Sequence, residues 1–128
     1  MQDCTKYPTA LKAAKYCYHN NLEDQDMQLM VMRNGPSAIA IDATSPDLVY
    51  LKEPFTSECP ANVDHAVLLV GWTKEHWIIK NSWGDEWGIK GFLYLPRGSN
   101  KCGVNTMLGV PLVKDLQSGQ SDNENLDN

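Results

Sequence analysis

Two neighbouring segments decide the fold: VDHAVLLVGW over residues 63–72 and HWIIKNSWG over residues 76–84. The apolar part of the first segment is typical of a strand buried on both faces, and the second segment returns as another strand after a short turn. Strands this close in sequence pair as a β-hairpin. The hairpin should bring His65 and Asn81 within hydrogen-bond reach, with Trp83 packed over them.

The remaining segments predict an α+β or mainly β domain. A helix is expected over residues 24–34, because apolar residues recur there at helical spacing, Asp24 can cap its start and Asn34-Gly35-Pro36 can end it. Alternation or apolar runs predict the strands, whereas prolines and the absence of a period predict irregular segments. The expected strands span residues 37–42, 66–72, 76–80 and 92–95, and the expected irregular segments span residues 1–22 and 44–62.

Length and charge limit the domain organisation and the partners. The chain has 128 residues and a net charge of −5, which suits one domain and argues against a nucleic-acid partner, because phosphate contacts need a basic patch. Much of the negative charge lies in residues 115–128, which contain little apolar surface to bury. We therefore expect an ordered domain over residues 1–114 and a disordered acidic tail over residues 115–128.

No feature predicts a membrane span, a metal or a cofactor. The longest apolar run, Ala66 to Trp72, is far shorter than the ~20 residues that a spanning helix needs. Lysines interrupt the N-terminal region, so no secretory apolar segment is expected there. The cysteines lack the paired C-x-x-C spacing of a zinc site.

Three motifs together resemble the papain and cathepsin family of cysteine proteases. VDHA at residues 63–66 resembles the family's histidine segment, and KNSWG at residues 80–84, followed by Trp87-Gly88 and Gly91, resembles its asparagine segment. NKCGV at residues 100–104 resembles its closing disulfide segment. The resemblance covers roughly residues 5–113. It implies the C-terminal half of the papain-like fold, an antiparallel, β-barrel-like right-hand domain with one helix and long loops.

The resemblance assigns His65 and Asn81 to catalysis. A thiol is a poor nucleophile until it is ionised, and an adjacent imidazolium stabilises the thiolate. The histidine then protonates the leaving amine as a general acid, while a neutral amide oxygen orients its ring. In isolation, a histidine at the start of an apolar strand is usually structural, and an asparagine is most often a turn former. The combination of motifs outweighs these readings.

Three further residues are expected to support the site. Trp83 is suited to cover the His65–Asn81 hydrogen bond and to keep water out. By resemblance, Trp87 lines the leaving-group side of the cleft and Ala66 lies beside the substrate channel. Taken alone, the two tryptophans would be ordinary core residues.

The family's nucleophile has no counterpart in this sequence. It lies in a Cys-Gly-Ser-Cys-Trp segment far upstream of the histidine, and no such segment occurs here. Cys4 lacks the glycine and tryptophan context, and Cys17 resembles a family cysteine that normally bridges to the other half. The oxyanion hole is missing for the same reason. We expect that this chain alone does not cut peptides.

The four cysteines allow three pairings into two disulfides. By resemblance, Cys59 and Cys102 form one bridge, because both stand where the family places a bridged pair. This leaves Cys4–Cys17 as the second bridge.

Several functions remain compatible with these residues. The chain could be the heavy-chain-like half of a cysteine endopeptidase that acts on peptide or protein substrates when a Cys-bearing N-terminal half completes it. It could instead be a protease-like homologue without activity that binds a protein partner or inhibitor through the old cleft face, or a folded remnant. The resemblance implies a lysosomal or extracellular location. An exposed apolar face around His65 and Trp87 is expected to cause self-association or capture of a partner.

Overall fold

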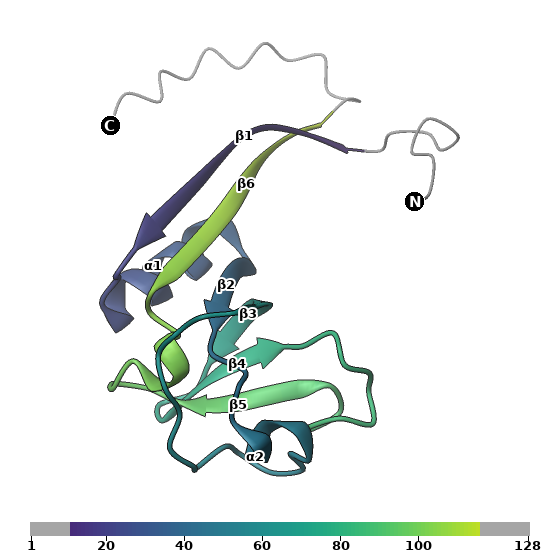
Figure 1. Ribbon diagram of the computed structural model, residues 1–128. Coiled ribbons are helices and arrows are strands. Elements are labelled where there is room, and N and C mark those ends of the chain that lie inside the picture. Colours follow the sequence, from purple (N-terminus) through teal and green to yellow (C-terminus); the bar gives the residue numbers. More distant parts are fainter. Residues whose placement is uncertain (1–10, 116–128) are drawn as a thin grey trace. The chain divides into compact units, whose positions relative to one another are not determined.

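The computed structural model describes residues 11–115 (Figure 1). The chain divides into two compact units. The larger unit is Cys17–Val110, and the described part of the smaller unit is residues 11–16 and 111–115. The helices are α1 (Asp24–Asn34), α2 (Pro46–Val49) and the 3-10 turn η2 (Lys101–Gly103). The strands are β1 (Leu11–Asn20), β2 (Ser37–Ile41), β3 (His65–Trp72), β4 (His76–Lys80), β5 (Phe92–Pro96) and β6 (Met107–Asp115).

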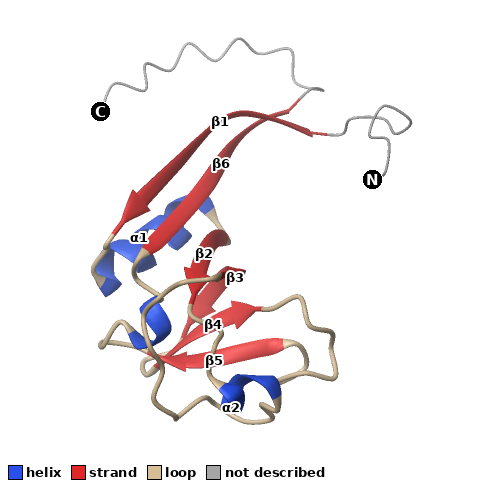
Figure 2. Ribbon diagram, viewed as in Figure 1, coloured by secondary structure: helices blue, strands red, loops and turns tan. Residues whose placement is uncertain are grey.

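The strands form one sheet in the order β1-β6-β2-β3-β4-β5 (Figure 2). The pairs β2–β3, β3–β4, β4–β5 and β2–β6 are all antiparallel. The predicted α+β class is confirmed, with one main helix. The sheet is open, with β1 and β5 as its outer strands, rather than closed into a barrel.

The predicted hairpin is confirmed as β3 and β4. Leu68 pairs with Lys80, the register shifts between Leu69 and Gly71, and the turn closes through a hydrogen bond from Thr73 N–H to the His76 carbonyl (2.8 Å). The expectation that the first strand is buried on both faces is wrong. Alternate residues of β3 are buried, because an antiparallel sheet can pack one face on the core and leave the other open.

The core lies between one face of the sheet, α1 and the loop before β3. Helix α1 contributes Met27 and Val31, and the segment between β2 and β3 contributes Leu48 and Phe55. That segment was expected to be irregular. It is a loop apart from the single turn α2, which begins at Pro46, and its buried side chains fix it to the domain.

Helix α1 spans the predicted residues but is not capped as expected. Its N-cap is Glu23, and no side chain caps it. The Asp24 carboxylate instead accepts a hydrogen bond from Asn105 Nδ2 (2.8 Å) and lies 3.6 Å from Arg97 Nε. The Asp24 carboxylate thus interacts with residues from distant segments instead of capping the helix. The helix ends as predicted, with Gly35 N–H donating to the Val31 carbonyl at a positive φ of 79°.

Residues 1–22 were expected to be irregular, and strand β1 corrects this for Leu11–Asn20, whereas residues 1–10 lie outside the described residues. The side chains of β1 from Lys12 to Asn20 are exposed, so no burial pattern marks it in the sequence. Its neighbour in the sheet is β6, which is almost ninety residues away in the chain. Strand β6 runs through Asp115, one residue into the segment expected to be disordered, and the rest of that segment lies outside the described residues. No helix in the described part is long and apolar enough to cross a membrane.

Candidate active site

The hairpin brings His65 and Asn81 to the same end of two neighbouring strands. His65 is the first residue of β3 and is the register partner of Ile41 in β2. Asn81 follows the last residue of β4, and its N–H donates to the Gly91 carbonyl (3.1 Å). Paired strands are about 4.8 Å apart, so side chains at adjacent strand ends are within reach of each other.

The two side chains are hydrogen-bonded, as predicted. His65 Nε2 lies 2.8 Å from Asn81 Oδ1, and Ser82 N–H donates to the same oxygen at 2.8 Å. The second donor identifies this atom of the amide as the oxygen. Because an amide oxygen can only accept, we assign the proton of the neutral ring to Nε2, which leaves Nδ1 with a lone pair.

Trp83 covers this hydrogen bond. Its ring stacks on His65 with the ring centroids 5.0 Å apart and the planes 30° apart. Trp87 meets Trp83 edge to face at 5.1 Å. The exposed fraction is 40% for Trp83 but only 7% for Trp87, whose Nε1–H donates to the Leu48 carbonyl at 2.7 Å. Trp87 therefore lies in the core in contact with Trp83 and is not part of an exposed face, which corrects that expectation.

The glycines after Trp87 shape the loop that holds Asn81. Gly88 has a φ of 60°, and a Cβ there would lie 2.5 Å from the Phe92 carbonyl oxygen. Gly91 also has a positive φ, and its carbonyl accepts the N–H of Asn81. The W-G-x-x-G spacing thus produces a turn that residues with a Cβ would distort.

Ala66 is exposed beside His65 and borders two shallow grooves. One groove, of about 240 Å³, is lined largely by apolar residues of β2, β3 and β6. The other, of about 390 Å³, runs from Ala66 to Asn81 and Ser82. An apolar surface therefore continues from the His65–Asn81 pair onto the open face of the sheet.

Comparison with known proteins identifies the family. Residues 1–112 match the sequence model of the papain family of cysteine proteases. The chain belongs to this family. Cathepsin K of Gallus gallus is 37% identical over 120 residues, which cover 86% of this chain and 36% of that protein. The viral cathepsin of Heliothis zea nuclear polyhedrosis virus is 38% identical over 103 residues, which cover 76% of this chain and 28% of the relative.

A solved structure supports the same assignment. The digestive procathepsin L2 proteinase from Tenebrio molitor larval midgut has a TM-score of 0.73 and 32% identity, over 87% of this chain and 37% of the other. This likeness confirms the predicted papain-like fold. The chain spans about a third of the length of these relatives.

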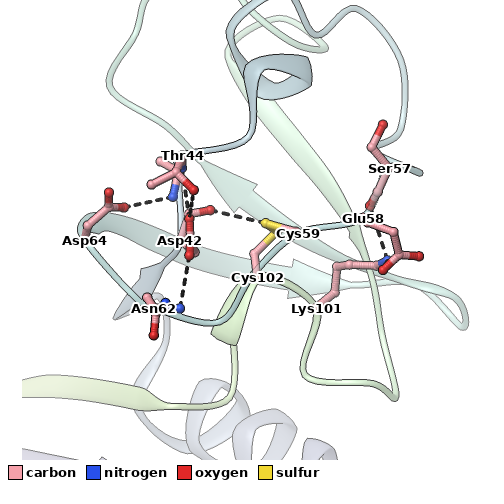
Figure 3. Close-up of a disulfide and its surroundings, with 10 residues drawn as sticks. Asp42, Thr44, Ser57, Glu58, Cys59, Asn62, Asp64, Lys101 and Cys102 are labelled. Carbon is pink, nitrogen blue, oxygen red and sulfur yellow. Dashed lines mark hydrogen bonds and ion pairs between the residues drawn. A yellow bond between two sulfur atoms is a disulfide. The ribbon is translucent and has the colours of Figure 1, made fainter.

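Within the described residues, the papain-family chain contains the disulfide Cys59–Cys102 (Figure 3). It joins the loop before β3 to η2 across 43 residues of sequence, and a loop of that length should stabilise the fold by about 4 kcal/mol in the chain-entropy model. The expected second bridge joins Cys17 to Cys4. Cys17 is a free, exposed cysteine in β1, and Cys4 lies outside the described residues.

Sequence reasoning missed Asp42, a charged residue buried next to the disulfide. The hydrogen bond from the Thr44 hydroxyl, together with backbone N–H groups of Thr44 and Asn62, holds the pKa of the Asp42 carboxyl below its usual value, although burial acts in the opposite direction. Its only signal in the sequence is a charged residue at the end of an apolar strand. Within residues 11–115, no cluster of three or more His, Cys, Asp or Glu side chains could hold a metal ion.

Proposed function

We propose that this chain supplies the histidine–asparagine half of a cysteine endopeptidase active site. The observation that carries the proposal is the 2.8 Å hydrogen bond between His65 Nε2 and Asn81 Oδ1, covered by the stacked ring of Trp83. This arrangement holds the ring in one orientation with Nδ1 free to accept a proton. A thiol beside Nδ1 completes the pair.

The reaction follows from these proton positions, with Nε2 protonated and Nδ1 able to accept a proton. The thiol gives its proton to His65 Nδ1, so a thiolate faces an imidazolium whose Nε2–H remains bonded to Asn81. The thiolate attacks the peptide carbonyl, and His65 returns the proton to the leaving amine. Water then hydrolyses the thioester, with His65 as the base. Asn81 is neutral, so it orients the ring without competing for the proton.

Peptide substrate is proposed to lie across the open face of the sheet, beside Ala66. The apolar groove there offers one wall of a binding cleft. The opposite wall, the thiol and the donors of the oxyanion hole are proposed to come from a Cys-bearing segment, either in the same polypeptide or in a separate chain. Without that segment, the free cysteine among the described residues, Cys17, lacks the family's Cys-Gly-Ser-Cys-Trp context, and hydrolysis of peptides is not expected.

The proposed compartment is one that permits disulfides, lysosomal or extracellular. The support is the Cys59–Cys102 bridge, since disulfides persist in oxidising environments and are rare in the cytosol.

Complementation tests the proposed function. The purified chain is mixed with Cys-bearing N-terminal segments of papain-family relatives, and hydrolysis of a fluorogenic peptide is followed. We expect no hydrolysis by either part alone and measurable hydrolysis by the pair.

Two variants provide the controls. His65→Ala should lower the hydrolysis rate of the pair by at least about a hundredfold, the lower range of general acid–base catalysis. His76→Ala, a substitution at the opposite end of β4, should leave the rate within about twofold of the wild type. Assembly of the two parts with no hydrolysis would favour a homologue that binds partners without catalysis.

A further inference from the structure

The segment that precedes His65, residues 60–64, has no regular secondary structure. Residues 60–64 connect Cys59 to the first residue of β3, and most of their side chains are exposed. Five residues of extended chain can span about 17 Å, so the disulfide at Cys59 leaves wide freedom for His65. The 2.8 Å hydrogen bond to Asn81 requires His65 to be positioned much more narrowly than the disulfide alone would hold it.

Asp42, which is buried, binds residues 60–64 through a hydrogen bond from Asn62. It directly follows Ile41, the register partner of His65, and only 1% of it is exposed. One carboxylate oxygen accepts the N–H (2.9 Å) and the hydroxyl (2.6 Å) of Thr44. The other accepts Asn62 N–H at 3.0 Å (Figure 3). The carboxylate thus joins the end of β2 to a point three residues before His65.

The residues on either side of Asp42 bind Asp64, the residue directly before His65. The Ile41 carbonyl accepts Asp64 N–H at 3.0 Å, and the Asp64 carboxylate accepts Ala43 N–H at 2.8 Å. Asp42 N–H donates to the Cys102 carbonyl at 2.7 Å, which anchors the same residues to η2. Asp64 is therefore fixed by the residues on either side of Asp42, immediately before His65.

The buried carboxylate of Asp42 holds residues 60–64 in place. A buried carboxylate is costly unless donors satisfy it, and the three donors of Asp42 come from the two segments that it joins. Movement of Asn62 away from Asp42 would remove one of those donors. The loop is also packed tightly, since a Cβ at Gly103 would lie 2.8 Å from Val63.

We propose that Asp42 is a positioning residue for His65. By joining Thr44 to Asn62, its carboxylate sets the path of residues 62–64 and thereby the hydrogen bond between His65 and Asn81. The effect of Asp42 on the activity of a completed peptidase rests on the proposed function above. The test uses the isolated chain and reads the histidine ring itself, so its outcome is independent of whether complementation yields hydrolysis.

The experiment is nitrogen and proton NMR of the full 128-residue chain, with His19 and His76 as internal references. In the wild type, the ring nitrogens of neutral His65 should report the single Nε2–H tautomer. Asp42→Asn cannot accept at both carboxylate positions, so it should mix the tautomers. It should also speed solvent exchange of the His65 Nε2–H by roughly tenfold, the equivalent of one ordinary hydrogen bond. The ring of His76 should not change.

Two variants separate positioning from general destabilisation. Thr44→Val keeps the shape of Thr44 but removes its hydroxyl donor, so a smaller change in the same direction is expected, and this variant decides the question if Asp42→Asn does not fold. Leu95→Ala weakens the core at the far end of the β4–β5 pair and should leave the His65 tautomer unchanged. A folded Asp42→Asn protein with wild-type His65 signals, or a Leu95→Ala protein with the same mixed tautomers, would overturn the proposal.

Discussion

Trp83 and Trp87 are four residues apart and have opposite environments. Trp83 is 40% exposed and stacks on the His65 ring, whereas Trp87 is 7% exposed and donates its indole N–H to the Leu48 carbonyl. The two residues thus divide two tasks, shielding the hydrogen bond of the site and fixing the loop that carries it. Trp83 lies within the asparagine segment and Trp87 follows it closely, and their sequence context alone does not reveal the difference in burial.

Replacing each tryptophan by alanine should separate these tasks. Trp87→Ala removes a buried ring and leaves a carbonyl without its donor, so the free energy of unfolding should fall by about 3–5 kcal/mol. Trp83→Ala should lower it by only about 1 kcal/mol, because the ring is partly in solvent already. Urea denaturation of both variants measures the difference. Equal losses would contradict the assignment of Trp87 to the core.

At the scale of elements, the site depends on how two loops meet the sheet. The glycines of the loop before β5 allow it to turn sharply and to accept the N–H of Asn81, and the loop before β3 is tied by Asp42 and by the disulfide. The strand ends alone give the approximate position of His65 and Asn81. The loops give the accuracy that a hydrogen bond of 2.8 Å requires.

The Asp42 connection predicts a pH dependence of stability. Its pKa is lowered in the folded state, chiefly by the Thr44 hydroxyl, relative to about 4 in an unfolded chain. The carboxylate therefore stabilises the fold above about pH 4, and this contribution is lost as the pH falls through the lowered pKa. Urea titrations between about pH 6 and pH 2 should show wild type and Asp42→Asn converging in acid.

A nearby aspartate provides the control for that titration. Asp47 is exposed in the first turn of α2, and no hydrogen bond of its carboxylate occurs within the described residues. Asp47→Asn should follow the wild-type profile at every pH. A constant gap between wild type and Asp42→Asn down to the lowest pH would show that ionisation of Asp42 contributes nothing.

At the scale of the whole molecule, the described residues leave an apolar groove on the open face of the sheet uncovered. The apolar groove beside Ala66 includes Met107, which is 41% exposed, and Tyr18, which is 59% exposed. A Cys-bearing segment would cover this face in the proposed enzyme. In its absence, contiguous apolar surface favours association.

We predict that the isolated chain self-associates through this groove. Sedimentation across a concentration series should show a rising average mass for the wild type and a monomer for Met107→Lys, because a charge in the groove is costly to bury. Met32→Lys places the same charge on the exposed face of α1 and should behave as the wild type. A wild-type chain that stays monomeric at high concentration would contradict the prediction, and an added Cys-bearing segment should compete with self-association.

The sequence by itself determined the helix, the hairpin and the proximity of His65 to Asn81. These features depend on near neighbours: helical spacing before Asn34-Gly35-Pro36, a turn between two apolar runs, and motif residues at the ends of adjacent strands. The same local reasoning predicted that Trp83 would cover the pair. The assignment of the pair to catalysis and the Cys59–Cys102 bridge, in contrast, followed from family resemblance and not from spacing.

Only the tertiary structure decided the pairing of β1 with β6, the burial of Trp87 and the role of Asp42. Each depends on a partner far away in the chain: Asn62 is 20 residues from Asp42, and Leu48 is 39 residues from Trp87. Burial and hydrogen bonds of this kind arise when distant segments pack, so no local period or turn signal encodes them. An exposed strand such as β1 is specified by its partner's backbone and not by its own side chains.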